Sequence, residues 1–248
     1  MKRADELITD LRLASSRSKA RALIEEGKVY CGGKPVDKPS RKYREDAEFV
    51  IDSDSMALRF VSRAGLKLEA YLDKFGIDLR GARILDAGAS TGGFTDCALY
   101  RGAESACCVD VGSGQLHEKI KSDPRVRNFE KTDARALTPE FFDGNLFDFI
   151  CADLSFISLE KVLEPLWSLL KTAGIMVCLV KPQFESAPNI MRKNKGVIRD
   201  ALLREEALRK IENFVSNKIP DARFIGRMES PIKGGDGNIE YLIGYRKG

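Results

Sequence analysis

Five charged side chains stand directly after short apolar runs of the sequence. They are Asp86, Asp110, Asp133, Asp153 and Lys181. In an open sheet of parallel strands, ligands bind outside the carboxyl ends of the strands, so residues at these positions would face one site. A single acid at a strand end is often a helix cap, but three in register on consecutive strands favour a bound ligand. The pattern therefore predicts a ligand site along one edge of a parallel sheet.

The first of these runs, residues 82–95, reads ARILDAGASTGGFT and passes from a strand through glycines into a helix. Taken alone, such a turn could be only a tight packing corner. Its spacing, D-x-G-x-S-x-G-G, differs from the G-x-G-x-x-G order that receives a dinucleotide pyrophosphate. The leading carboxylate suits S-adenosylmethionine, which carries an amine, a sulfonium and ribose hydroxyls, better than it suits NAD. The residues expected to bind this cofactor in the loop are Asp86, Gly88, Ser90, Gly92, Gly93 and Phe94.

Three further acids extend the expected cofactor site. Asp110 lies 24 residues after Asp86, close to the distance at which an acid accepts hydrogen bonds from ribose hydroxyls. Asp133 follows the third strand and could accept a hydrogen bond from an adenine amino group. Asp153, at the end of the fourth strand, completes the set.

The middle of the predicted sheet faces the group that receives the methyl. Asp153 follows the apolar run FDFICA, and Lys181 follows GIMVCLV. The N-P-P-Y or D-P-P-Y motif of exocyclic-amine methyltransferases does not follow the fourth strand, and no cysteine stands in a Pro-Cys nucleophile setting. A ribose hydroxyl is the acceptor that remains.

A 2′-hydroxyl must lose its proton as it attacks, which leaves two roles open for Lys181. It could act as the general base if its ammonium loses charge, which desolvation and a second cation such as Lys67 promote and neighbouring carboxylates oppose. Alternatively, Lys181 orients the hydroxyl and stabilises the developing oxygen charge. In either role, Asp153 and Glu240 would hold the two ammonium groups in place.

Strands and helices alternate from residue 62 onward, which predicts an α/β fold with a parallel sheet and helices on both faces. Strands are expected at residues 84–86, 106–111, 126–130, 147–152, 175–180, 223–228 and 239–245. Helices are expected at residues 62–75, 95–100, 115–121, 159–170 and 202–215. No helix separates the last two strands, so the final strand should be antiparallel. Residues 189–195, rich in Lys, Arg and Asn, are expected to form a loop.

The first residues predict a small separate domain. Helical spacing at residues 4–11 and 16–26 precedes a hairpin that turns at Gly32 and Gly33. Residues 1–44 carry 12 Lys or Arg against 6 Asp or Glu, so positive charge is concentrated here. We expect a domain at residues 1–55, a linker at 56–62 and a catalytic domain at 63–248.

The composition limits the classes of protein to consider. With 248 residues and 43% hydrophobic content, the chain can bury the core of one large and one small domain. Its six cysteines show no C-x-x-C spacing, which predicts free thiols of a reducing compartment and no metal site. The sequence has no signal-peptide core and no apolar run near the roughly 20 residues of a membrane helix. We therefore expect a cytoplasmic protein that does not associate with membranes.

The stretch ASSRSKARALIEEGKVYCGGKPV resembles the S4-type RNA-binding domain. This resemblance implies that the second helix and the hairpin lie against RNA backbone. The cations that it places there are Arg17, Lys19, Arg21, Lys28 and Lys34. Such contacts position an RNA without reading its sequence. The alternative is that these cations form only a solvated helix face.

The whole chain resembles the TlyA, or hemolysin A, family, in which an S4-type domain precedes an FtsJ-like methyltransferase. The matching stretches are SRAGLKLEAYL, LDAGASTGGFTDCAL, VDVGSGQL, ADLSFISL, VKPQFE, KGVIRD and GGDGNIEYL. The resemblance implies a Rossmann-like class I methyltransferase fold with a seven-stranded, mostly parallel sheet. It also implies 2′-O-methylation of cytidines in ribosomal RNA, with ribosomal RNA or ribosomal subunits as partners. The family's catalytic Lys, Asp, Lys and Glu fall on Lys67, Asp153, Lys181 and Glu240.

Two other functions remain as alternatives. A non-catalytic ribosome-assembly factor would keep the RNA docking, although the presence of all four proposed catalytic side chains argues against it. Membrane lysis, which the hemolysin name suggests, would need a spanning segment or a strongly amphipathic apolar helix, and the sequence has neither.

Overall fold

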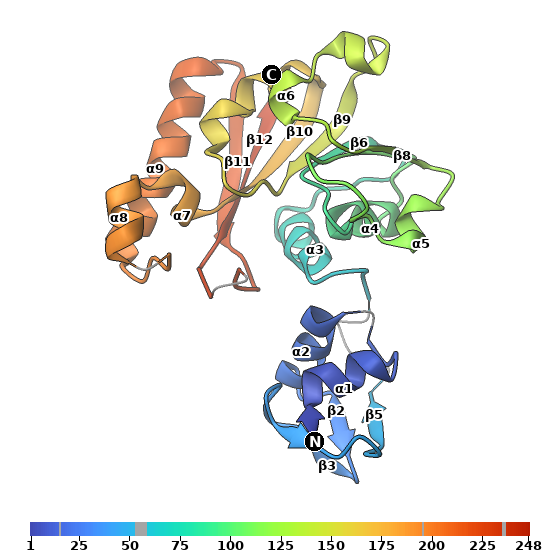
Figure 1. The fold of residues 1–248 in the computed structure, drawn as a ribbon. Coiled ribbons are helices and arrows are strands. Elements are labelled where there is room, and N and C mark those ends of the chain that lie inside the picture. Colours follow the sequence, from blue (N-terminus) through green and yellow to red (C-terminus); the bar gives the residue numbers. More distant parts are fainter. Residues whose placement is uncertain (15, 53–58, 195, 235–236) are drawn as a thin grey trace. The chain divides into compact units, whose positions relative to one another are not determined.

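The structure is a computed structural model, and it describes residues 1–14, 16–52, 59–194, 196–234 and 237–248. These residues form two compact units, Met1–Arg63 and Ala64–Gly248 (Figure 1). Each unit has its own hydrophobic core. The expected linker at residues 56–62 lies partly outside the described residues. In the described part of the chain, no helix is both long and apolar enough to cross a bilayer.

The smaller unit packs two helices, α1 (Ala4–Asp10) and α2 (Arg17–Glu25), with short antiparallel strands. The strands are β1 (Lys2–Arg3), β2 (Val29–Cys31), β3 (Lys34–Pro35), β4 (Lys42–Tyr43) and β5 (Phe49–Ile51). The expected hairpin is confirmed, because β2 pairs with β3 across Gly32 and Gly33, whose φ angles are 55° and 72°. Two consecutive positive φ angles are what a tight two-residue hairpin turn requires, and glycine adopts them without strain.

The larger unit is built on a seven-stranded sheet in the order β11-β12-β10-β9-β6-β7-β8. The strands are β6 (Arg83–Ala87), β7 (Ser105–Val109), β8 (Val126–Phe129), β9 (Phe147–Ala152), β10 (Leu170–Val180), β11 (Ala222–Glu229) and β12 (Tyr241–Lys247). Strands β8, β7, β6, β9 and β10 pair in parallel, whereas β12 is antiparallel to both of its neighbours. The predicted α/β fold and the antiparallel final strand are therefore confirmed.

Helices cover both faces of this sheet (Figure 1). The α-helices are α3 (Ala64–Phe75), α4 (Gly93–Tyr100), α5 (Glu118–Lys121), α6 (Leu163–Ser168), α7 (Pro182–Glu185), α8 (Pro188–Lys193) and α9 (Ala201–Lys218), and short 3-10 turns are η2 (Ala134–Ala136), η3 (Pro139–Phe142) and η4 (Leu159–Lys161). Helices α6 and α9 share one core cluster with the sheet. Helices α3 and α4 pack together on the opposite face.

Two glycines bring α3 close to the antiparallel end of the sheet. A Cβ at Gly226 would collide with the ring of Phe75, and a Cβ at Gly244 would collide with the hydroxyl of Tyr71. The Tyr71 hydroxyl also donates a hydrogen bond to the Gly226 carbonyl at 2.8 Å. Lys67 lies four residues before Tyr71, on the same side of the helix. The packing of α3 therefore directs Lys67 toward the sheet.

Three helical predictions differ from the structure, and the first is the helix expected at residues 115–121, which begins only at Glu118. The helix expected at residues 159–170 is divided into η4 and α6, and β10 begins at Leu170. Pro165 lies in the first turn of α6 and has no N–H to donate to the carbonyl of Lys161, so the hydrogen bond that would continue η4 into α6 is missing. The loop expected at residues 189–195 is in part helical, because α8 begins at Pro188. Proline is well suited to the first helical position, where its fixed φ fits and the missing N–H is not needed.

Candidate active site

A cavity of about 170 Å³ lies at the carboxyl ends of β6, β9 and β10. Its lining residues are Ala64, Asp86, Gly88, Ala89, Ser90, Thr91, Phe94, Asp153, Ser155 and Lys181. The structure thus brings together six of the residues singled out in the sequence. They come from three neighbouring strand ends, as the edge of a parallel sheet requires.

Lys181 forms the most direct polar contact within this cavity. Its Nζ lies 2.6 Å from Asp153 Oδ1 and donates a hydrogen bond to Ser155 Oγ at 2.9 Å. The Lys181 side chain is 10% exposed and that of Asp153 is 18% exposed. The two residues directly follow β10 and β9, which pair in parallel. An ammonium is therefore fixed at the cavity wall by a carboxylate and a hydroxyl.

A second buried lysine–carboxylate pair lies beside the first. Lys67 Nζ is 2.6 Å from Glu240 Oε2, and the two side chains are 10% and 4% exposed. In the antiparallel ladder Val180 pairs with Tyr241, so Lys181 and Glu240 occupy the next opposed positions. Lys67 and Glu240 are not among the residues that line the cavity. Glu240 is therefore the ladder neighbour of Lys181, and Lys67 reaches Glu240 from α3.

The segment before β12 is built around the Glu240 carboxylate. A Cβ at Gly234 would collide with Glu240 Oε1, so only glycine allows the backbone to pass this close. Asn238 is 2% exposed and ties this segment to residues 196–198. Its side chain accepts a hydrogen bond from the Ile198 N–H and donates one to the Gly196 carbonyl, both at 2.9 Å. The two motifs KGVIRD and GGDGN are thereby joined.

Asp86 is a buried carboxylate, and one of its two oxygens accepts hydrogen bonds from Thr95. Its Oδ2 accepts hydrogen bonds from the Thr95 N–H at 3.0 Å and from the Thr95 hydroxyl at 2.7 Å. Its Oδ1 is buried and has no hydrogen-bond partner among the residues described. Burial raises the pKa of Asp86 from 3.8 to about 7. A buried acceptor beside a cavity marks a position where a donor or a cation would bind favourably.

Glycines shape the loop after Asp86. Gly88 has φ +83°, and a Cβ there would lie 2.6 Å from the Asp153 carbonyl oxygen. Gly92 has φ +87°, and a Cβ there would press on Leu116 and Ile120. Gly92 precedes α4, which begins at Gly93 and buries Phe94. Gly88 therefore lets the loop approach the end of β9 closely, and Gly92 lets it pass close to Leu116 and Ile120.

Comparison with known proteins identifies the family. Residues 60–247 match the family of FtsJ-like methyltransferases, and residues 2–49 match the S4 domain. The chain belongs to the FtsJ-like methyltransferase family. It is 40% identical over 241 residues to a protein of Bacillus subtilis provisionally named rRNA methyltransferase YqxC, covering 97% of this chain and 84% of that protein. It is 39% identical over 244 residues to the 16S/23S rRNA (cytidine-2′-O)-methyltransferase TlyA of Mycobacterium tuberculosis, covering 98% and 89%.

Further relatives confirm the resemblance to the TlyA and hemolysin A proteins. The chain is 39% identical over 245 residues to hemolysin A of Brachyspira hyodysenteriae, covering 98% of this chain and 99% of that protein. A solved structure from Streptococcus thermophilus, provisionally described as a hemolysin, has a TM-score of 0.77 and 37% identity. It covers 99% of this chain and 88% of that chain. The similarity of this FtsJ-like methyltransferase to its relatives thus extends over both units.

The structure of this FtsJ-like methyltransferase gives the remaining two predicted cofactor acids different surroundings. Asp110 accepts hydrogen bonds from the N–H groups of Ser90 at 2.8 Å and Gly112 at 2.7 Å, so it braces the glycine loop. Asp133 caps η2 by accepting from the Arg135 N–H at 2.9 Å and also pairs with the Arg135 guanidinium. These contacts with Arg135 lower the pKa of Asp133. Neither acid lines the cavity.

An aromatic residue beside the cavity was not identified from the sequence. Phe156 is 92% exposed, and its φ of 65° is unusual for a residue other than glycine. Its ring centroid lies 5.2 Å from that of Phe184, whose ring in turn lies 5.8 Å from Lys181 Nζ. The signal was present in the stretch DLSF, where a large aromatic side chain follows the polar residues of a strand end. Such a ring is suited to stacking against a nucleotide base.

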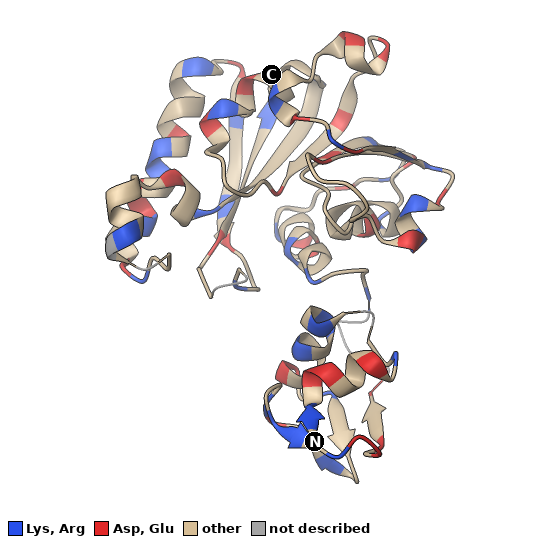
Figure 2. Cartoon of the chain, in the orientation of Figure 1, with Lys and Arg blue, Asp and Glu red and all other residues tan. Residues whose placement is uncertain are grey.

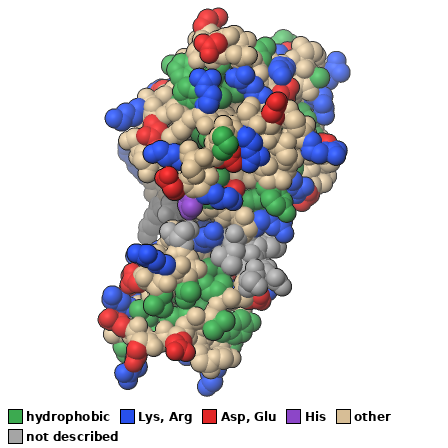
Figure 3. Space-filling view, turned by 90° about the vertical axis from the view of Figure 1, so that its right-hand side faces the viewer, with side chains coloured by type: hydrophobic (Ala, Val, Ile, Leu, Met, Phe, Trp, Pro, Cys, Tyr) green, Lys and Arg blue, Asp and Glu red, His purple; other side chains and the backbone are tan. Residues whose placement is uncertain are grey.

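The five predicted RNA-binding cations lie in the S4 domain. In this domain α1 carries several Asp and Glu residues, and α2 carries several Lys and Arg residues (Figure 2). Arg17 lies within 3.5 Å of Asp5 and Glu6, Lys19 donates to the Phe60 carbonyl at 3.0 Å, and Lys28 pairs with Asp52 at 2.7 Å. Arg21 and Lys34 are exposed. On the face that Figure 3 shows, Lys and Arg side chains are interspersed with Asp and Glu. Charge alone therefore does not mark an RNA-binding patch on that face.

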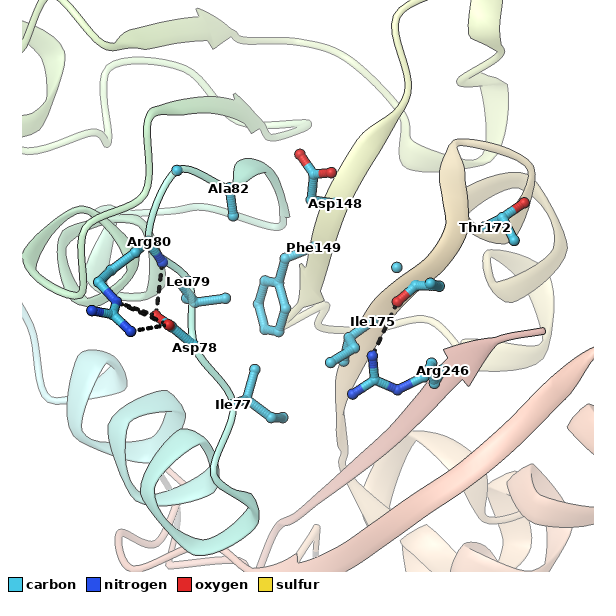
Figure 4. Close-up of a pocket in the computed structure, with 13 residues that line it drawn as sticks. Ile77, Asp78, Leu79, Arg80, Ala82, Asp148, Phe149, Thr172, Ile175 and Arg246 are labelled. Carbon is cyan, nitrogen blue, oxygen red and sulfur yellow. Dashed lines mark hydrogen bonds and ion pairs between the residues drawn. The ribbon is translucent and has the colours of Figure 1, made fainter.

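A second cavity, of about 340 Å³, lies near the amino ends of β6 and β9 and beside the first part of β10 (Figure 4). Its charged residues bond to one another, to backbone or to a neighbouring side chain, as Asp148 does to Lys171. Arg80 pairs with Asp78, and Arg246 donates to the Ala173 carbonyl at 3.2 Å. None of the predicted cofactor or catalytic residues lines it. The chemistry expected from the sequence therefore belongs to the cavity at the carboxyl edge.

Proposed function

We propose that this protein transfers a methyl group from S-adenosylmethionine to the 2′-hydroxyl of a ribose in ribosomal RNA, with cytidine as the target nucleotide. The observation that carries the proposal is the pair of neighbouring buried contacts, Lys181–Asp153 and Lys67–Glu240, at the end of the sheet. The relatives named for cytidine-2′-O-methylation support the substrate. In this proposal residues 1–55 bind the RNA and residues 63–248 perform the transfer. We infer a cytoplasmic location from the proposed ribosomal RNA substrate.

The residues of the cavity fit S-adenosylmethionine. Asp86 Oδ1, which has no hydrogen-bond partner among the described residues, suits a cationic amine. Because Gly88 has no side chain, a ligand can approach the backbone at the edge of the sheet. We assign to Asp110 the ribose hydroxyls, because its carboxylate receives two hydrogen bonds here and can accept more. We assign to Asp133 the adenine amino group because it follows β8 at the same edge of the sheet; its hydrogen bonds from Arg135 would have to rearrange to admit this donor. Ser90, Gly92, Gly93, Phe94 and Asp153 complete the proposed cofactor set. When bound, this cofactor supplies an electrophilic methyl group on a positively charged sulfur.

We assign to Lys181 the task of orienting the ribose hydroxyl. Its Nζ lies 2.6 Å from Asp153 Oδ1, and an ammonium held at this position can donate a hydrogen bond to the ribose hydroxyl. From its fixed position at the cavity wall, this ammonium would stabilise the negative charge that develops on the 2′-oxygen. Lys67 and Glu240 would keep Lys181 in place and balance the local charge. The hydroxyl proton would pass to solvent water as the oxygen takes the methyl group, and positioning and electrostatic stabilisation would supply most of the rate.

Transfer of a labelled methyl group to ribosomal subunits or free ribosomal RNA tests the proposal. We expect the wild-type protein to transfer label and Lys181→Ala to lose at least about 100-fold in rate, because it removes a donor aimed at the developing charge. Lys171→Ala is a matched control, since Lys171 lies at the other end of β10 and pairs with Asp148 at 2.8 Å. It should transfer label at the wild-type rate.

Two results would contradict the proposal. Lys181→Ala that is as active as Lys171→Ala would remove the assigned role. A wild-type protein that binds subunits and cofactor without transferring label would instead support a ribosome-assembly factor.

A further inference from the structure

Glu185 is a buried acid that does not line the cavity and that the mechanism above does not use. Its side chain is 1% exposed. It accepts hydrogen bonds from the Ser158 hydroxyl at 2.5 Å, from the Leu159 N–H at 2.8 Å and from Lys210 Nζ at 3.2 Å. The donors come from the loop after β9, from η4 and from α9. A carboxylate this deeply buried is stabilised only by such partners, so its contacts are specific.

These contacts join the two segments that carry the reacting side chains. Helix α7 begins directly after Lys181 and ends at Glu185, so one helical turn connects the two residues. Ser158 ends the loop that begins at Asp153 and contains Ser155. Glu185 therefore connects the segment that carries Lys181 with the segment that carries both partners of its ammonium.

The bridged loop needs such support. Phe156 within it has φ +65°, a conformation that costs a non-glycine residue on the order of 1–3 kcal/mol and persists only where the surroundings enforce it. The Phe156–Phe184 ring contact, at 5.2 Å, joins the same two segments from the exposed side. Without the Glu185 acceptor, the Ser158 hydroxyl and the buried Leu159 N–H would lose their partner.

We propose that Glu185 is a positioning residue for methyl transfer: it fixes the loop of residues 154–159 against the turn after Lys181. It thereby sets the distances from Lys181 Nζ to Asp153 Oδ1 and Ser155 Oγ. This inference rests on the function proposed above. Because a displacement of about 1 Å at a reacting group can cost about 100-fold in rate, a loosened loop should reduce turnover while the cofactor loop after β6 stays intact.

The test compares Glu185→Ala and Glu185→Gln with Glu160→Gln. Glu160 is a matched control because it pairs with the same Lys210, at 3.1 Å, but its side chain is 32% exposed and lies outside the bridge. We expect Glu185→Ala to lower kcat about 10- to 100-fold with the cofactor Kd within about twofold of wild type. Glu185→Gln keeps an acceptor oxygen and should recover most of that loss. Equal kcat values for Glu185→Ala and Glu160→Gln would overturn the proposal.

Hydrogen exchange gives a readout that needs no methyl transfer. The amides of residues 154–159 should exchange faster in Glu185→Ala than in the wild type or Glu160→Gln, while those of α4 stay unchanged. Unchanged exchange in the loop would refute the positioning role even if kcat falls. If the wild-type protein transfers no methyl group but the loop amides still exchange faster in Glu185→Ala, the proposed function is refuted. The structural role of Glu185 in holding the loop is then still supported.

Discussion

Asp86→Asn should stabilise the protein in the absence of ligand, and increasingly so as the pH rises. Burial raises the pKa of Asp86 from 3.8 to about 7, so the folded protein holds this proton more tightly than the unfolded chain does. The stability contributed by the protonated acid is fully present below pH 3.8 and is lost as the pH rises through about 7. At 1.36 kcal/mol per pKa unit, the charged carboxylate costs at most about 4 kcal/mol above pH 7. An uncharged isostere avoids this cost.

Urea unfolding at several pH values measures this effect. Trp167 is the single tryptophan and lies in the core of the larger unit, so its fluorescence follows the unfolding of that unit. The difference in unfolding free energy between Asp86→Asn and wild type should be near zero at pH 4 and should favour the variant by up to about 4 kcal/mol at pH 8. Asp86→Asn should also bind S-adenosylmethionine more weakly, because a neutral amide cannot balance a cationic amine.

Asp133→Asn is a control of opposite sign. The contacts with Arg135 lower the pKa of Asp133, so its contribution to stability is present above the unfolded pKa and is lost as the pH falls. This variant should therefore be destabilised at pH 7 and approach wild type in acid. If the difference between Asp86→Asn and wild type stays constant from pH 5 to pH 8, the claim that Asp86 is a buried acid with a raised pKa in the folded protein is refuted.

Three further predictions concern the cofactor loop, the exposed aromatic ring and the S4 domain. Gly88→Ala should abolish measurable cofactor binding by calorimetry and lower the unfolding free energy by on the order of 1–3 kcal/mol, because its Cβ would meet the Asp153 carbonyl at a positive φ. Phe156→Ala should raise the KM for RNA without lowering the melting temperature, because the Phe156 ring is 92% exposed. Phe156→Trp should restore the KM, since it keeps an aromatic ring for stacking. An unchanged KM in Phe156→Ala would exclude stacking. Replacing Arg21 and Lys34 by alanine should reduce the slope of log binding constant against log salt concentration by about 0.7 to 0.9 for each RNA phosphate that the variant no longer neutralises. An unchanged slope would favour the interpretation of these cations as a solvated helix face.

The sheet and its acidic edge could be predicted because local patterns encode them. The apolar runs that end at Asp86, Asp153 and Lys181 are strand signals, and the topology of parallel strands places their carboxyl ends together. That is why the Lys181–Asp153 contact follows from sequence reasoning. The two residues need only follow the ends of neighbouring parallel strands.

Other contacts could not be derived from local patterns. Lys67 and Glu240 are 173 positions apart, and their pairing depends on how α3 packs over two glycines of the antiparallel strands. Glu185 resembles any acid near a helix end, and only the folded chain shows that it binds donors on the loop after β9, on η4 and on α9. Phe156 follows a strand end in the stretch DLSF, but the sequence does not show that its ring is 92% exposed and contacts the ring of Phe184. Each of these features depends on tertiary packing, which sequence periodicity does not encode.

The most direct test of the central claim asks which atom of the RNA receives the methyl group. Ribosomal RNA labelled by the wild-type protein should be hydrolysed in alkali and its products separated by size. Cleavage requires a free 2′-hydroxyl, so a ribose methylated at that oxygen protects the adjacent phosphodiester bond. We predict that the label appears in alkali-resistant dinucleotides that begin with cytidine. Label in mononucleotides would place the methyl group on a base and contradict the account.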